Sequence, residues 1–451
     1  MRYAPRPRIP LNDYGVLGDP PEPGTWTPTL PVSVIVSARG HARSLRLTLA
    51  GLAAQSYPAH LLEVIVVDAG DGPPVVLPDR VPERTRVIRP EPGTSRTPDA
   101  GAAVADGHVV HLLDADLVLP PEHIEAHMRW HHLADHLVVL SRPRHAPGIE
   151  GKRTERRPDR TSDLRAAGPK AFTAMVGVPA SVPADLLRAS GGWQPSGEYT
   201  ELGYRLAQAG AVFLAERHAR SVRIGTAAEP DRSYLAEHVP TLRRLRRQPR
   251  RTHLVPYVEA VVPVGDAAAE DVRATVDGLL ASDLHDIVVI VAGPPPGDGA
   301  QAIQEAYAGR SRVVFAGDAP GPASQSVPFR FHCPPGWVPS PQTLGSIVAF
   351  ADRKALGVLS LALDEREGVV SARLERTAAM NRARLLARPG EDLDDLVHET
   401  FGTLWEAGET WGIAAASAPR PETSRPEQPR EAARRSRNPL RRVLVGLLTR
   451  T

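Results

Sequence analysis

The chain has 451 residues and a formal net charge of +2, so it offers no overall basic surface for binding nucleic acid. Its single cysteine, Cys333, excludes an intramolecular disulfide bond and a cysteine-rich zinc site. The N-terminus lacks the pattern of an export signal, and no apolar run approaches the roughly 18 residues of a membrane-spanning helix. We therefore expect a soluble, cytoplasmic protein of two or three domains that binds no nucleic acid.

Residues 1–30 are rich in proline and glycine without periodicity, which predicts an extended arm. Beyond the arm, short apolar runs alternate with segments of helical spacing. The predicted strands are residues 32–36, 64–67, 86–88, 109–113 and 211–214. The predicted helices are residues 44–55, 98–105, 122–136, 184–190 and 198–208. This alternation predicts an α/β fold class, with a mostly parallel sheet flanked by helices.

Aspartates stand at the ends of two predicted strands. Asp114 and Asp116 lie two residues apart, so in an extended chain they project to the same side. Such a pair suits Mg²⁺ or Mn²⁺ carrying a diphosphate; the alternative is that it only solvates a strand end. Asp68 ends another strand, and ligands of parallel sheets sit at the carboxyl ends of strands. The three aspartates together favour a nucleotide-type site.

Three histidines, His123, His127 and His131, recur every four residues in the predicted helix 122–136 and could share one face. Histidines at this spacing can bind zinc, but the metalloprotease glutamate is missing and no further ligand is evident. We therefore expect a polar, solvated helix face, with zinc binding as the alternative.

Two segments are polar and rich in arginine. Residues 142–165 are either a solvated loop or a flap near an anionic ligand, and the sequence leaves both open. Residues 413–451 hold nine arginines against three glutamates, which predicts a disordered basic tail. Its last part, 439–450, could form a short amphipathic helix that weakly contacts the inner face of a membrane; a frayed tail is the alternative.

An ordered set of motifs spans about residues 31–226. These are the strand 32–36, the segment 44–58, Val66-Val67-Asp68, Arg96 before an Ala/Gly-rich helix, Leu112 to Asp116, and Gly191-Gly192-Trp193 followed by 198–206. In their order and spacing they resemble the family 2 glycosyltransferases of GT-A fold. The resemblance implies transfer of a sugar from a nucleotide-diphosphate donor to the hydroxyl of a glycan, lipid or small-molecule acceptor.

The resemblance also implies roles for individual residues. Asp68 would hydrogen-bond the nucleotide base, Arg96 would lie near the nucleotide or diphosphate, and Asp114 would approach the ribose. Asp116, with Asp114, would bind the Mn²⁺ or Mg²⁺ that bridges the diphosphate. A metal and an arginine can stabilise the charge that develops on this leaving group.

The sequence departs from the family at two positions. The place of the usual catalytic aspartate is held by Tyr199, a poor base at neutral pH. Glu198 or Glu201 could substitute as the base that activates the acceptor. Arg223 stands where a histidine is often found. The alternative to an active transferase is therefore a catalytically impaired, transferase-like binding or scaffold protein.

The pattern of the first domain, 31–245, starts again after the basic linker 243–251. Residues 258–262, 273–279 and 287–293 repeat the opening strand, helix and second strand. In this repeat Cys333 and Pro335 take the places of Asp114 and Asp116. We therefore expect residues 255–412 to form a second, smaller and degenerate GT-A-like α/β domain, which serves packing, homodimerisation or acceptor positioning.

Overall fold

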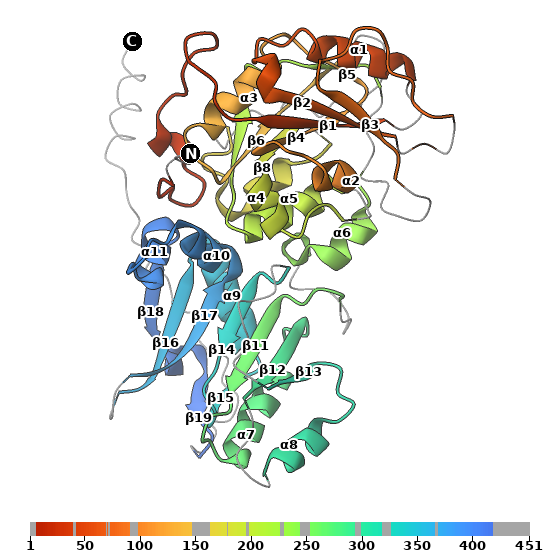
Figure 1. Cartoon of the computed structure of the whole chain (residues 1–451). Coiled ribbons are helices and arrows are strands. Elements are labelled where there is room, and N and C mark those ends of the chain that lie inside the picture. The colour runs from red at the N-terminus through yellow and green to blue at the C-terminus, as the bar shows by residue number, and fades with distance from the viewer. Residues whose placement is uncertain are drawn as a thin grey trace, which may run out of the picture.

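The computed structural model describes residues 6–38, 42–68, 70, 73–90, 98–146, 163–177, 179–194, 198–225, 230–243, 253–293, 299–317, 326–365 and 369–417. Within these ranges the chain forms two α/β units, one above the other in Figure 1. No helix in the described part of the chain is long and apolar enough to cross a bilayer.

The first unit is built on a seven-stranded sheet of order β3-β2-β1-β4-β8-β6-β9. Its strands are β1 Val32–Ala38, β2 Leu62–Asp68, β3 Thr85–Ile88, β4 Val109–Asp114, β6 Leu137–Ser141, β8 Ala180–Pro183 and β9 Val212–Glu216. All neighbouring strands are parallel except β8, which is antiparallel to β4 and β6. The predicted α/β class with a mostly parallel sheet is confirmed.

Helices cover both faces of this sheet because apolar side chains alternate along strands that are buried on both sides. Val34 and Val36 pack in the core that contains Leu49 and Met128, and Ile35 packs in the opposite core. The helices are α1 Ala42–Leu52, α2 Pro98–Ala103, α3 His123–His131, α4 Ala184–Ala189, α5 Tyr199–Gln208 and α6 Arg232–His238. A small sheet of β5 Leu117–Val118, β10 Val222–Arg223 and β7 Arg144–His145 lies beyond β4.

The second unit contains a sheet with the same strand order and the same strand directions, β13-β12-β11-β14-β17-β16-β18. Its strands are β11 Val258–Pro263, β12 Ile287–Ala292, β13 Val313–Ala316, β14 Phe329–His332, β16 Val358–Asp364, β17 Val370–Arg376 and β18 Thr403–Ala407, with β15 Trp337–Pro339 and β19 Ile413–Ala415 as a separate pair. Its helices are α7 Ala269–Leu280, α8 Gly299–Tyr307, α9 Thr343–Lys354, α10 Thr377–Leu386 and α11 Leu393–Thr400. The topology supports a repeat, whose common origin stays a prediction.

One hydrogen bond recurs in both units and fixes their alignment. Thr48 of α1 donates its hydroxyl to the carbonyl of Leu117 over 2.8 Å, and Thr275 of α7 donates to the carbonyl of Trp337 over 3.0 Å. Matching Leu117 with Trp337 places Pro334 and Gly336 opposite Asp114 and Asp116. The predicted counterparts Cys333 and Pro335 are therefore wrong by one residue, although the second unit still has no acid at this place.

The predicted arm crosses the junction between the units. Residues 6–30 are mostly irregular, with one short 3₁₀ turn, η1 Tyr14–Leu17. Ile9 is fully buried, and the amide of Leu11 donates to the carbonyl of Thr400 in α11 over 2.6 Å. Arg382 of α10 donates to Ala211 of the first unit over 2.6 Å and to the carbonyl of Leu11. The arm therefore packs against both units.

Three predicted features lie outside the described residues in whole or in part. They are the basic tail from residue 418 onward, most of the linker 243–251, and residues 147–162 of the predicted flap.

Candidate functional site

The strand order of the first sheet brings two of the predicted aspartates together. The order runs from β3 through β2 to β1 and then changes direction to β4, which makes the carboxyl end of β1 the topological switch point. Asp68 at the end of β2 is paired in register with Ala38 of β1. Asp114 at the end of β4 is paired with Ser37. The two carboxylates therefore flank the end of β1, where ligands of open α/β sheets bind.

Asp68 is buried and shapes the loop that follows β2. Its carboxylate oxygens accept hydrogen bonds from the backbone amides of Gly70 and Val75, each over 3.2 Å. Arg89 approaches it at 3.8 Å. The predicted contact of Asp68 with a nucleotide base stays a prediction, and Arg96 lies outside the described residues.

The acidic pair at the end of β4 is clamped by Arg223 of β10. One guanidinium nitrogen, Nη1, donates to both oxygens of Asp116 over 2.8 and 3.0 Å. The other, Nη2, donates to Asp114 Oδ2 and to the carbonyl of Gly177, each over 2.7 Å. The remaining oxygen, Asp114 Oδ1, accepts the hydroxyl of Tyr199 over 3.1 Å. All four carboxylate oxygens of the pair thus accept a hydrogen bond from the protein.

Burial governs the electrostatics of this cluster. Desolvation raises the pKa of Asp116 above its ordinary value, although the Arg223 charge acts in the opposite direction. Desolvation alone would lower the pKa of Arg223, but Asp114 and Asp116 raise it. The side chain of Arg223 is only 3% exposed, whereas that of Asp114 is 30% exposed. The Asp114 end is therefore the side from which a ligand could reach the cluster.

The arrangement does not fit a resident divalent cation. A cation needs carboxylate lone pairs directed at it, and in this cluster those oxygens face a guanidinium and a phenol. Gly225 lies so close to Asp116 that a Cβ atom built on it would be 2.4 Å from Oδ2. The chain at Gly225 therefore leaves no room for a cation on that side of Asp116. The sequence identified Arg223 as a departure from the family but not as the partner of both aspartates.

Tyr199 occupies the predicted position of the base at the start of α5. Burial and the neighbouring Asp114 raise its pKa well above the ordinary value, so the phenol stays protonated and donates a hydrogen bond to Asp114. Trp193 packs edge-on against its ring at 4.8 Å. Tyr199 is therefore a hydrogen-bond donor that orients Asp114.

The two glutamates that could replace the base already have partners. Glu201 forms a buried two-bond ion pair with Arg205 at 2.6 and 3.0 Å, and Arg205 also donates to the carbonyls of Ser190 and Gly192. Glu198 accepts the backbone amide of Asp231 at the start of α6 over 2.8 Å. A catalytic role for either glutamate stays a prediction.

The solvated face predicted for the helix 122–136 is wrong. His123 and His127 are fully buried and His131 is 1% exposed, because α3 packs on the sheet. The helix also carries a buried ion pair between Arg129 and Glu216 at 3.2 Å. Since an imidazole counts as polar in a sequence pattern, the hydrophobic pattern of this helix concealed its burial.

A cavity of about 610 Å³ lies at the junction of the units, separate from the acidic pair. Arginines line it, and two of them have carboxylate partners: Arg243 contacts Asp286 at 2.5 Å and Arg376 contacts Asp352 at 3.0 Å. These pairs account for the charges of Arg243 and Arg376, and Lys170, Arg353 and Arg382 also line the cavity.

Comparisons with known proteins bear on the first unit. The family model described as glycosyl transferase family 2 matches residues 33–179. Similar solved structures include the mannosyltransferase PcManGT from Pyrobaculum calidifontis in complex with GDP-Man and Mn²⁺, at 21% identity and a TM-score of 0.33, covering 47% of this chain and 60% of that one. Another is S. aureus TarS 1–349 in complex with UDP-GlcNAc, at 18% identity and a TM-score of 0.33, covering 45% of this chain and 60% of that one.

A third is GalNAc-T7 with UDP, GalNAc and Mn²⁺, at 15% identity and a TM-score of 0.33, covering 46% of each chain. The chain thus spans 60% or less of the length of these three structures. No curated protein matches the chain. The match to the family model covers β1 to β4 and both members of the acidic pair, so residues 33–179 resemble glycosyl transferase family 2 and lie within a mixed α/β fold.

Proposed function

We propose that residues 31–245 form a glycosyltransferase domain that binds a nucleotide-diphosphate sugar and transfers the sugar to an acceptor hydroxyl. The observation that carries this proposal is the placement of Asp68 and Asp114 on the two sides of β1, inside the segment that matches the family model. The acceptor class, whether glycan, lipid or small molecule, and the donor sugar follow from no contact described above.

We further propose that Arg223, instead of Mn²⁺ or Mg²⁺, offsets the negative charge of Asp114 and Asp116, so that a donor diphosphate can bind beside them without a divalent cation. The Arg223 guanidinium is held at the switch point by two carboxylates and a carbonyl, so it needs no reorganisation. Its Nη2 contacts Asp114, the more exposed member of the pair, and this contact faces the side that a diphosphate would approach.

A second candidate is a transferase-like protein that binds the donor without turning it over. It is favoured by Tyr199, because a phenol with a raised pKa cannot take a proton from an acceptor hydroxyl at neutral pH. In both candidates the second unit, which has no acid at the corresponding strand end, would position the acceptor or pack against the first unit.

Calorimetry on the full-length protein with UDP and GDP, in EDTA and in MnCl₂, tests donor binding. We expect one nucleotide to bind with the same affinity in both buffers and Asp114→Asn to weaken it at least tenfold. The matched control is Asp185→Asn, which removes an exposed partner of Arg188 on α4 and should leave binding unchanged. If neither nucleotide binds in either buffer, both candidates fail.

Incubation with the matching nucleotide sugar then separates the two candidates. Release of nucleoside diphosphate that is lost in Asp114→Asn supports the transferase. Binding without release over hours supports the binding protein. Affinity that appears only with Mn²⁺ would refute the role proposed for Arg223.

A further inference from the structure

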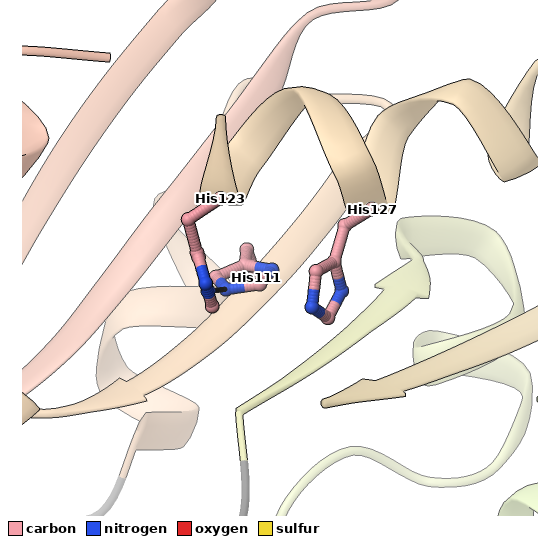
Figure 2. Close-up of side chains that lie close together, drawn as sticks. All are labelled: His111, His123 and His127. Carbon is pink, nitrogen blue, oxygen red and sulfur yellow. Dashed lines mark hydrogen bonds between the residues drawn. The ribbon is translucent and has the colours of Figure 1, made fainter. Parts of the chain in front are cut away.

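A cluster of three fully buried histidines lies between β4 and α3, apart from the acidic pair. His111 comes from the strand, and His123 and His127 come from one face of the helix. Figure 2 shows the three rings gathered together, with His111 between the two helix residues. Their candidate ligand nitrogens all lie within 4.8 Å of one another, and no other such group of three occurs in the part of the chain that the structure describes.

We propose that His111, His123 and His127 bind one zinc ion, which joins α3 to the strand that carries Asp114. This site is independent of the transferase proposal and uses none of its residues.

The spacing of the nitrogens suits a tetrahedral metal. With Zn–N bonds of about 2.0–2.1 Å, two ligands of a tetrahedral ion lie about 3.3–3.4 Å apart. His111 Nε2 and His123 Nε2 are 3.2 Å apart. The ring of His127 lies 4.5 Å from that of His111 and 5.1 Å from that of His123, measured between centroids. Because the candidate nitrogens lie within 4.8 Å of one another, the His127 ring would have to move closer to the other two to form the third Zn–N bond.

The hydrogen bond of His127 selects the nitrogen that would face the metal. Its Nδ1 lies 2.9 Å from the hydroxyl of Ser181, on β8. Ser181 is paired in register with His111 on the neighbouring strand, so its hydroxyl lies beside His111 on the same sheet. When Nδ1 donates to Ser181, the lone pair remains on Nε2, for which no partner exists among the described residues. Metal-bound histidines are commonly oriented by such a second hydrogen bond.

Without a metal, this cluster is a costly way to fill a core. Nε2 of His127, the nitrogen that would bind the metal, lacks a hydrogen-bond partner among the described residues. Each buried polar group left unpaired costs about 1–3 kcal/mol. Burial also lowers the pKa of all three histidines, that of His123 to about 3, because a charged imidazole loses its solvation in the core.

The chemistry of the cluster selects the metal. Three imidazoles without a carboxylate suit zinc and related transition metals, whereas Mg²⁺ and Mn²⁺ favour oxygen ligands. The polar neighbours of the cluster include the hydroxyl of Ser181, which contacts His127 Nδ1. His131 Nε2 lies 2.8 Å from the same Ser181 hydroxyl. A water or small anion would complete the fourth position, as in three-histidine zinc sites.

The test uses full-length protein that has been stripped with a chelator and titrated with ZnCl₂ or CoCl₂. We expect one Zn²⁺ per chain by elemental analysis and visible absorption bands typical of four-coordinate Co²⁺. His123→Gln should weaken metal binding by at least about 100-fold, and Ser181→Ala by about 10–100-fold. His131→Gln is the matched control, because His131 is on the same helix, is equally buried and contacts Ser181, yet lies outside the cluster.

X-ray absorption on the zinc-loaded wild-type protein keeps the proposal testable even if the variants do not fold. Three imidazoles in the zinc shell are expected. A shell of oxygen ligands only, a wild-type protein that binds no zinc after ZnCl₂ titration, or equal losses in His123→Gln and His131→Gln would each overturn the proposal.

Discussion

Replacing Arg223 with histidine should convert the acidic pair from an ion-paired cluster into a metal-binding one. The substitution removes the guanidinium that occupies both aspartates and supplies an imidazole at the position where a metal ligand is expected in the family. An unperturbed imidazole is largely neutral at pH 8, whereas the guanidinium that it replaces is always charged. Without metal, Asp114 and Asp116 then face each other without a compensating cation.

The magnitude follows from the burial of the cluster. Removing one partner of a buried ion pair costs about 3–5 kcal/mol. Because the Asp114 side chain is 30% exposed and water can solvate it, we expect the lower end, about 3 kcal/mol. For a unit of this size that corresponds to a fall of about 6–12 °C in melting temperature. Mn²⁺ at 100 times its Kd would restore about 2.7 kcal/mol.

Thermal melts of protein stripped of zinc beforehand, in EDTA and in MnCl₂, measure both effects. The wild-type protein should melt at the same temperature in both buffers, whereas Arg223→His should melt lower in EDTA and recover in Mn²⁺. Arg217→His is the control, because Arg217 pairs with Asp163 on the surface with 69% of its side chain exposed, and its loss should matter little. The reasoning is refuted if Arg223→His melts at the wild-type temperature in EDTA, or if its melting temperature is the same with and without Mn²⁺.

Three further predictions concern stability. Arg382→Met removes the buried guanidinium that joins the arm to both units and should lower the free energy of unfolding by about 3 kcal/mol in urea titrations, whereas the neighbouring Arg384→Met should change it by less than about 0.5 kcal/mol; equal effects would contradict the bridging role. Glu375→Gln tests acid sensitivity: burial raises the pKa of Glu375, but its contacts with a histidine and an arginine lower it more, to about 2. The stability from this carboxylate is present above pH 4.5 and is lost as the pH falls toward 2, by roughly 3 kcal/mol, so the variant should show a shallower acid limb in pH-dependent unfolding; an unchanged limb would contradict the shift. Gly107→Ala would place a Cβ atom 2.4 Å from the backbone nitrogen of Ser33, so calorimetry should show that the free energy of unfolding falls by about 1–3 kcal/mol. An unaltered melting temperature would show that β1 shifts to accept the methyl group without cost.

The fold was predictable at most strands where burial leaves a continuous apolar pattern, although β6 has such a pattern and was missed. The central strands read as short apolar runs because helices cover both faces of the sheet. The prediction missed β6 and β8, and β8 is a four-residue antiparallel strand containing a serine and a proline. Such a strand owes its place to its neighbours in the sheet, which no local pattern reveals.

The sequence predicted the acidic residues of the candidate site that lie at strand ends, but it did not predict the residues that contact them. Asp114 and Asp116 stand out because an apolar run stops at them. Arg223 reaches them from a two-residue strand 107 positions later in the chain, a distance that leaves no periodic signal. His111 was missed for a related reason, since a single polar residue inside an apolar strand looks like a tolerated exception until the helix above it is placed.

The N-terminal arm has a consequence for the order of synthesis. Leu11 docks onto Thr400, and Arg8 pairs with Glu399 at 2.5 Å, so the arm leaves the ribosome long before its partners exist. At about 5–20 residues per second, roughly 20–80 s separate the two events. The arm is therefore made well before the second unit, and its contacts with Thr400 and Glu399 form only after that unit has been made. Ile9, fully buried in the finished protein, packs with Trp130, Leu137 and Val212 of the first unit, so its apolar contacts need no residue of the second unit.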